Sequence, residues 1–181
     1  MRIVIFGTSG SGKTTMARDL AAALSLPLIE LDMINWQPGW RGLSADDPDE
    51  FARRVDAATA GDRWVSDGNY GVVRSLLWTR ATHLVWLDYQ RHVIMTRVVR
   101  RSVMRAFDRR ELWPGTGNRE RWTHWFRASH PIRWAWSTWE RRRVEAEARL
   151  SEPRYAHLSV VRLRHPREAG DVHRRLRAAT R

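Results

Sequence analysis

The chain has 181 residues, which is enough for one α/β domain with a sizeable core, and it contains no cysteine. Disulfides and thiolate metal sites are therefore excluded, and the composition suits the reducing cytoplasm, where we expect the protein to lie. No apolar run approaches membrane-spanning length, and a strand predicted from residue 2 leaves no room for a signal peptide. The formal net charge of +12 at pH 7 favours anionic partners, which include nucleotides, nucleic acid and acidic membrane surfaces.

A glycine-rich stretch follows the first predicted strand. Residues 2–6 are expected to form a short buried strand, and residues 15–24 a helix with one apolar face. Residues 7–14 match the P-loop pattern G-x-x-x-x-G-K-[ST] at every fixed position. Glycines let the backbone turn its N–H groups toward an anion, and the following helix adds its positive end. The match predicts a nucleotide site made by Gly7, Ser9, Gly10, Ser11, Gly12, Lys13, Thr14 and Thr15.

Two side chains of this loop have distinct expected roles. Lys13 is the only lysine in the chain, and it supplies a mobile positive charge for the β- and γ-phosphates of a nucleotide. The Thr14 hydroxyl is expected to bind Mg²⁺. The alternative interpretation, a glycine-rich turn before an ordinary helix, leaves the full match between a strand and a helix unexplained.

The rest of the chain alternates between strand and helix patterns. Short apolar runs predict strands, and apolar residues three and four apart predict helices. Proline, glycine and acidic residues mark the element ends. In chain order we predict a strand at 28–31, a loop at 33–42, a helix at 46–61, a strand at 64–66, a helix at 72–78, a strand at 83–88, a helix at 91–107, a loop at 114–117, one or two helices at 119–150 with a break near Pro131, a strand at 158–163 and a last helix from 166.

Three carboxylates directly follow predicted strands. Asp32 is a candidate to orient or deprotonate an acceptor hydroxyl or to bind Mg²⁺ through water, and a turn-capping role is the alternative. Asp67 fits the carboxylate that holds Mg²⁺ through water at the end of a Walker B strand, with a helix cap or turn as the alternative. We expect Asp88 to be structural and to pair with Arg91 or with the backbone.

Aromatic and cationic side chains suggest how an acceptor and its phosphate are enclosed. Trp36 and Trp40 either form an aromatic wall for an acceptor ring or help to pack the small acceptor-side helix against the core. Arg97, Arg101 and Arg105 share one face of the predicted helix 91–107. They suit a mobile lid that lays guanidinium groups on the transferring phosphate, and a solvated basic face is the alternative.

Alternating strands and helices predict an α/β fold in which a five-stranded parallel sheet is covered on both faces. No repeat or linker divides the chain, so we expect a single domain over residues 1–181. Ligands of such sheets bind beyond the carboxyl ends of the strands. The P-loop and the carboxylates after the strands are therefore expected to gather at one edge.

These motifs together resemble the adenylate-kinase-like P-loop kinases, and more closely the bacterial DNA topology modulation proteins of the FlaR-like group. The features run from residue 1 to about 120, with a looser match through the fifth strand. They are the P-loop, Leu31-Asp32, Trp36, Pro38-Gly39-Trp40, Trp64, Asp67-Gly68-Asn69-Tyr70, Arg80-Ala81, Trp86-Leu87-Asp88, Arg100-Arg101, Leu112-Trp113 and Gly117-Asn118-Arg119-Glu120.

The resemblance implies a three-layer kinase fold with sheet order 2-3-1-4-5, an acceptor-side insertion at 33–62 and an arginine-rich lid and helical region at about 97–150. It implies ATP, Mg²⁺ and transfer of the γ-phosphoryl group to an acceptor held over strands two and three. Adenylate kinases have an arginine soon after the strand-three Asp-Gly that binds the acceptor phosphate. Here Asn69-Tyr70-Gly71 intervene and the nearest arginine is Arg74, so a monophosphate acceptor is not implied.

The candidate residues fall into four groups. The catalytic candidates are Lys13, Asp32, Asp67, Arg97 and Arg101, and the metal candidates are Thr14 and Asp67. The resemblance places Arg164 in a loop that passes the adenine, so Arg164 joins the P-loop residues as a nucleotide contact. The substrate candidates are Trp36, Trp40, Asn69, Tyr70 and Arg74.

The predicted function is a phosphotransferase that uses ATP and a small-molecule or nucleotide acceptor. The alternative is a nucleic-acid-associated P-loop NTPase, because arginines and tryptophans are interleaved across residues 119–143 and can contact phosphates and stack on bases. Four of these tryptophans recur at helical spacing, which is also typical of packing. A surface helix on an anionic membrane is a weaker third possibility for the same region.

Overall fold

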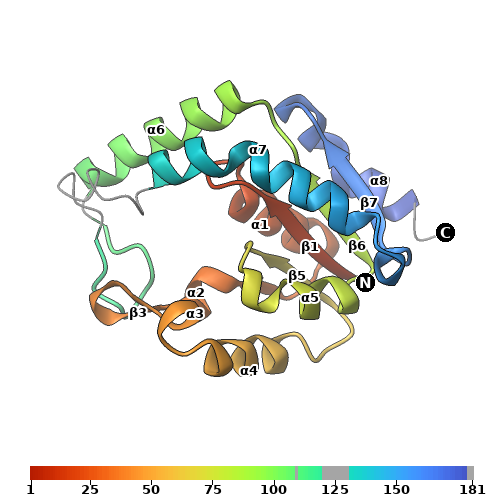
Figure 1. Ribbon diagram of the computed structural model, residues 1–181, viewed down its shortest axis with the longest axis horizontal. Helices are drawn as coiled ribbons and strands as arrows, with labels where there is room; N and C mark the ends of the chain where they lie inside the picture. Colours follow the sequence, from red (N-terminus) through yellow and green to blue (C-terminus); the bar gives the residue numbers. More distant parts are fainter. Residues whose placement is uncertain (109, 120–130, 179–181) are drawn as a thin grey trace.

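The computed structural model describes residues 1–108, 110–119 and 131–178, and its centre is a five-stranded parallel sheet (Figure 1). The sheet has the order β2-β5-β1-β6-β7, because β5 pairs between β1 and β2. Numbered within the sheet alone, this is the predicted order 2-3-1-4-5, and the predicted fold class is confirmed. The strands are β1 (Arg2–Gly7), β2 (Leu28–Glu30), β5 (Trp64–Asp67), β6 (His83–Leu87) and β7 (Ser159–Leu163).

Helices cover both faces of the sheet, as Figure 1 shows. Alternate residues of β1 supply the two cores: Ile3 and Ile5 pack on one face, and Val4 and Phe6 on the other. The first core is completed by α1 (Lys13–Leu24), α6 (Arg91–Asp108) and α8 (Val172–Ala178). The second is completed by α2 (Leu31–Asn35), α4 (Pro48–Ala58) and α5 (Gly71–Arg80).

The long helix α7 (Pro131–Leu150) links the two cores and packs along α6. Ala135 near its start belongs to the first core, and Ala146 near its end belongs to the second. Trp139 also packs against the first core, whereas Trp136 is 57% exposed. The helical spacing of the tryptophans in the sequence therefore did not imply that all of them are packed. The predicted helical residues 120–130 lie outside the described part of the chain.

The segment predicted as a loop at 33–42 has regular structure of its own. After α2, an antiparallel hairpin forms from β3 (Trp36–Gln37) and β4 (Arg41–Gly42), joined by the 3-10 turn η1 (Pro38–Trp40). Short helix α3 (Leu43–Asp46) follows, and its Ser44 N–H donates to the buried Asn35 side chain at 2.8 Å. These contacts stabilise strands too short to be recognised from sequence alone.

Two other helix starts follow local signals. Asp47 caps α4 by accepting from the Glu50 N–H at 3.0 Å, with Pro48 in the first turn, as the acidic stretch predicted. The predicted last helix begins instead as the 3-10 helix η4 (Pro166–Asp171) and continues as α8. Another 3-10 turn, η3 (Pro153–Tyr155), precedes β7. None of the helices within residues 1–108, 110–119 and 131–178 has the length and apolar character needed to cross a bilayer.

Asp88 is structural, but its partners differ from those predicted. Its side chain is 5% exposed and accepts from Arg162 at 2.6 and 2.8 Å, while Arg143 Nε lies 3.4 Å from its other oxygen. Arg91 instead stacks on the Trp136 ring, with 3.6 Å from guanidinium carbon to ring centroid, and donates to the Trp136 carbonyl oxygen. The ion pairs thus join β6, β7 and α7.

Replacing Asp88 with alanine is expected to lower the free energy of unfolding by about 2 kcal/mol, because two partly buried guanidinium groups lose their carboxylate. Urea unfolding followed by circular dichroism measures the change. Asp62→Ala is the control, since Asp62 is 95% exposed and pairs only at the surface with Arg2, so its loss should cost no more than about 0.5 kcal/mol. Equal stabilities for the two variants would contradict the structural role of Asp88.

Candidate functional site

The P-loop connects the end of β1 to the start of α1. Gly10 and Gly12 have φ values of +84° and +95°, in the left-handed region that favours glycine. Gly12 occupies the N-cap position of α1, so the free N–H groups of the first turn face the loop. Within the loop Ser11 is buried, and Thr15 is exposed on the first turn of α1. The backbone therefore has the curvature that an anion-binding loop requires.

Lys13 lies inside this loop. Its Nζ donates to the Thr8 carbonyl oxygen at 3.0 Å. Burial lowers the pKa of the Lys13 amine to about 8; Asp67 and Asp32 partly offset this, and Arg101 lowers it further. A phosphate placed against Nζ would supply the negative charge that favours the ammonium form.

Thr14 and Asp67 are joined at the end of β5. The Thr14 hydroxyl donates to Asp67 Oδ2 at 2.5 Å. Within the described residues, Asp67 Oδ1 is buried and has no hydrogen-bond partner. Burial raises the pKa of the Asp67 carboxyl, against the lowering effects of Thr14 and Lys13. A hydroxyl and an orphaned carboxylate oxygen beside a phosphate loop fit a Mg²⁺ site in their chemistry.

Asp32 lies at the start of α2 and is held by Tyr70. The Tyr70 hydroxyl donates to Asp32 Oδ1 at 2.5 Å. Burial and the nearby Asp32 raise the pKa of Tyr70, so the phenol stays protonated and acts as the donor. The Tyr70 ring packs against Phe51 of α4, with centroids 5.0 Å apart. Tyr70, predicted as a substrate contact, is thus a direct partner of the predicted catalytic carboxylate.

Arginines from α5 and α7 approach the same region. Arg74 Nη2 donates to Asn69 Oδ1 at 2.9 Å, so these two substrate candidates lie together. A small cavity beside the P-loop is lined by Thr8, Asn69 and Arg142, among others. Burial lowers the pKa of Arg142, and neighbouring Arg74 lowers it further. Arg142 was missed from the sequence. The sequence shows a run of three arginines, but it does not show which of them α7 turns toward this cavity.

Two of the three predicted lid arginines contact the P-loop itself. Arg97 Nη1 donates to the Ser11 carbonyl oxygen at 3.1 Å, and Arg101 Nη2 lies 3.3 Å from Ser9 Oγ. A methyl group added at Gly10 would come within 2.3 Å of Val98, which confirms close packing of α6 on the loop. These two members of the arginine face therefore lie at the phosphate end of the site.

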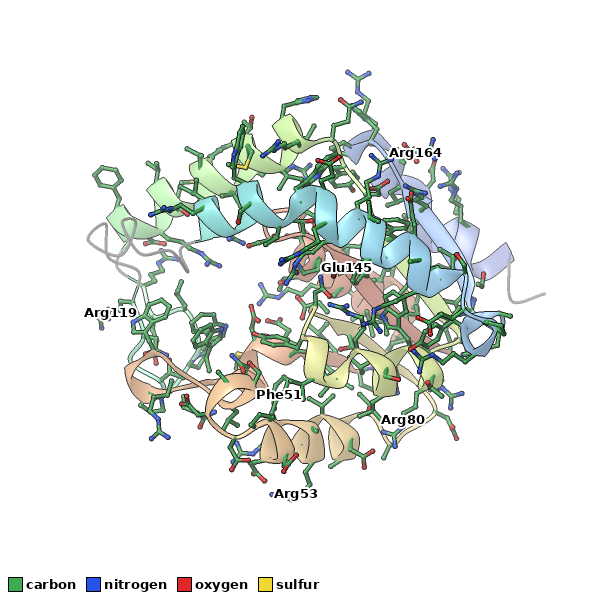
Figure 2. All side chains as sticks on the ribbon, viewed as in Figure 1. Phe51, Arg53, Arg80, Arg119, Glu145 and Arg164 are labelled. Carbon is green, nitrogen blue, oxygen red and sulfur yellow. The ribbon has the colours of Figure 1, made fainter. Side chains whose placement is uncertain are left out.

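The remaining candidates are two tryptophans and Arg164. Trp36 and Trp40 pack against Trp113, a residue that follows α6, and their expected part in an aromatic wall for an acceptor ring stays a prediction. Arg164 is exposed after β7, at the outer surface of the molecule in Figure 2. Its expected contact with the adenine stays a prediction.

Comparisons with known proteins bear on the fold of the chain. The family model described as "ATPase family associated with various cellular activities (AAA)" matches residues 3–60. No curated protein matches the chain in sequence. Shikimate kinase from Acinetobacter baumannii in complex with shikimate is similar in structure, with 15% identity, a TM-score of 0.60 and coverage of 99% of this chain and 92% of that chain. A gluconokinase from Sinorhizobium meliloti 1021 is also similar in structure, with 19% identity, a TM-score of 0.53 and coverage of 99% of this chain and 94% of that chain. The chain thus has the P-loop kinase fold.

Proposed function

We propose that this protein transfers the γ-phosphoryl group of ATP to a hydroxyl of a small-molecule or nucleotide acceptor. The proposal is supported by the P-loop, by the kinase fold and by two carboxylates near Lys13. These are Asp67 and Asp32, whose charges partly offset the effect of burial on the pKa of Lys13. Phosphoryl transfer needs, besides the metal-binding carboxylate, a group that orients the attacking nucleophile. Asp32, held by Tyr70, is the observation that carries the proposal, because it supplies a positioned second carboxylate for an acceptor.

Different residues act on ATP and on the acceptor. The P-loop amides and Lys13 bind the phosphates, and Thr14 and Asp67 hold Mg²⁺, which neutralises charge on the β- and γ-phosphates. The bond from the γ-phosphorus to the β–γ bridging oxygen breaks as one forms to the acceptor oxygen, whose proton passes to Asp32. Arg97 and Arg101 stabilise the charge on the transferring group.

We place the acceptor between α2 and α5, with Asp32 held by Tyr70 on one side and the pair of Asn69 and Arg74 on the other. Arg142 is added to the predicted set as a cation that faces this region from α7. The assignment keeps the predicted single domain, with residues 33–62 on the acceptor side and residues 97–150 as the arginine-rich covering region. Among P-loop kinases, the motif resemblance still favours the topology modulation proteins.

Single-turnover transfer from ATP labelled at the γ-phosphate tests this function. The acceptor panel should contain shikimate and gluconate, which the names of the structural neighbours suggest, together with sugars and nucleoside monophosphates. We expect Mg²⁺-dependent label in one organic acceptor class. Release of inorganic phosphate alone, across the whole panel, would contradict the kinase assignment.

Tyr70→Phe is expected to lower the transfer rate about 10-fold with little change in the KM for ATP, because it removes the hydrogen bond that orients Asp32 and keeps the ring against Phe51. Steady-state kinetics with the acceptor found in the panel gives both constants. Tyr155→Phe is the matched control: its hydroxyl lies 3.4 Å from Ser75 Oγ, and its ring packs on Trp78. A similar loss in both variants would argue for a general packing effect.

A nucleic-acid-associated NTPase is the second candidate, supported by the net charge of +12 and the exposed Trp136 stacked with Arg91. Much of the interleaved segment 119–143 lies outside the described residues. Salt-dependent DNA binding with DNA-stimulated ATP hydrolysis would favour this function. Absence of binding at low salt would eliminate it.

A further inference from the structure

Three tryptophans join the acceptor-side hairpin to the segment after α6. The Trp113 ring stacks on Trp36, with centroids 5.1 Å apart and an interplanar angle of 23°. Trp40 packs edge-on against both rings, at 5.9 Å from Trp36 and 5.7 Å from Trp113. Such offset and edge-to-face arrangements are favourable aromatic geometries. These ring contacts join residues far apart in the sequence. Figure 1 shows the path of residues 110–119 down to β3.

Asn118 adds polar specificity to this contact. Its side chain is nearly buried, its Oδ1 accepts from the Trp40 N–H at 2.9 Å, and its Nδ2 donates to the Gln37 carbonyl oxygen at 2.9 Å. One amide thus satisfies a donor and an acceptor on either side of the hairpin turn. Trp40 has φ +63°, a conformation that non-glycine residues rarely adopt, so the turn benefits from this support. We call Trp36, Trp40, Trp113 and Asn118 the latch.

Part of the latch follows, along the chain, the helix that contacts the P-loop. Arg97 and Arg101 on α6 bond to oxygens of Ser11 and Ser9 in the loop. Helix α6 continues toward residues 110–119, which carry Trp113 and Asn118, and the hairpin they contact directly follows α2. Asp32 is in the first turn of α2. Residue 109, between α6 and residues 110–119, lies outside the described residues.

We propose that the latch couples the nucleotide site to the acceptor site. The inference rests on the proposed function. It states how binding of the nucleotide and binding of the acceptor influence each other. Bound phosphates compete with neutral oxygens of the loop for Arg97 and Arg101, because charge-assisted bonds to phosphate are stronger. Their rearrangement moves α6, and the latch transmits the movement to the hairpin and α2. Coupling between sites is reciprocal, so an acceptor tightens nucleotide binding through the same contacts.

Hydrogen exchange of the full chain with and without Mg²⁺ and the analogue AMP-PNP tests this without an acceptor. In the wild type we expect protection in peptides that cover the P-loop and α6, and a linked change in peptides that cover residues 36–42. In the double variant Trp113→Ala/Asn118→Ala, the hairpin response should fall about fivefold or more, while the P-loop response persists. Trp113→Phe with Asn118→Asp serves as the milder variant if the alanine pair does not fold.

Trp136→Ala is the matched control, because it removes an exposed tryptophan of α7 that is outside the latch. It should keep the full hairpin response. The proposal is overturned if the P-loop responds in the wild type and the hairpin does not, or if the latch variants keep the full response. If neither the P-loop nor α6 responds, nucleotide binding itself is absent and the proposed function fails together with this inference.

Discussion

Replacing Lys13 with alanine should weaken binding of Mg-ATP about 100-fold, because the loop loses the charged donor for the β- and γ-phosphates. In the absence of nucleotide, Lys13 Nζ already donates within the loop, to the Thr8 carbonyl oxygen. The ammonium therefore needs only a small movement to reach a phosphate. Isothermal titration with Mg-AMP-PNP measures the change in affinity.

The Lys13→Ala variant should fold normally. Burial lowers the pKa of the Lys13 amine to about 8, below its unfolded value of 10.5. The folded state therefore disfavours the charged amine at pH 7, and this cost is relieved only as the pH rises from about 8 to 10.5. Removing the amine should leave the melting temperature at pH 7 unchanged or raised. A binding defect without a folding defect is the expected pair of results.

Arg18→Ala provides the matched control on the same helix. Arg18 is an exposed cation of α1 that pairs with Glu30, so its removal changes the net charge by the same amount and should alter nucleotide affinity less than about threefold.

Because Lys13 is the only lysine in the chain, a second measurement is available. An amine-specific reagent can modify only Lys13 and the N-terminus, and bound nucleotide should protect Lys13. Wild-type affinity in Lys13→Ala would contradict the P-loop assignment.

Asp67→Asn should abolish the advantage that Mg²⁺ confers on ATP binding and should lower phosphoryl transfer about 100-fold or more. The substitution preserves the shape of the side chain and leaves an oxygen to accept from Thr14. It removes the charge on the buried carboxylate, whose Oδ1 has no hydrogen-bond partner among residues of the described ranges. Affinity for ATP measured in EDTA should stay equal or improve, because a negative charge near the phosphates is gone.

Titrations with and without Mg²⁺ separate this expectation from a general loss of the site. Glu30→Gln is the control, since Glu30 pairs in register with Asp67 at the end of the neighbouring strand β2. Its variant should keep a normal Mg²⁺ effect. If Asp67→Asn also kept the Mg²⁺ effect, the carboxylate would be a structural partner of Thr14 and nothing more.

The P-loop and the strands around it follow from local patterns. The glycine spacing, the apolar run before it and the helical spacing after it predict a strand, a phosphate loop and a helix, because each depends on neighbouring residues. Asp32 and Asp67 come together for a related reason: parallel strands place their carboxyl ends at one edge. The order of the strands came from the resemblance, and the observed pairing of β5 between β1 and β2 agrees with it.

Other features depend on contacts between distant residues. Asp88 was expected to pair with Arg91 or with the backbone, yet Arg162 and Arg143 from β7 and α7 reach its side chain. Trp36 and Trp40 had two possible roles in the sequence, and their packing partner Trp113 comes from the segment after α6. No spacing rule links these residues, so the partners could not have been chosen beforehand.

The sequence by itself determined that the protein has a P-loop between a strand and a helix, a parallel α/β sheet and carboxylates at the ends of its strands. Only the tertiary structure decided that Tyr70 holds Asp32, that Arg142 faces the P-loop and that Asn118 fastens the acceptor-side hairpin. The physical reason is the range of the interactions. Backbone conformation responds to neighbours along the chain, whereas hydrogen bonds and ring stacking between separate elements exist only after those elements have packed.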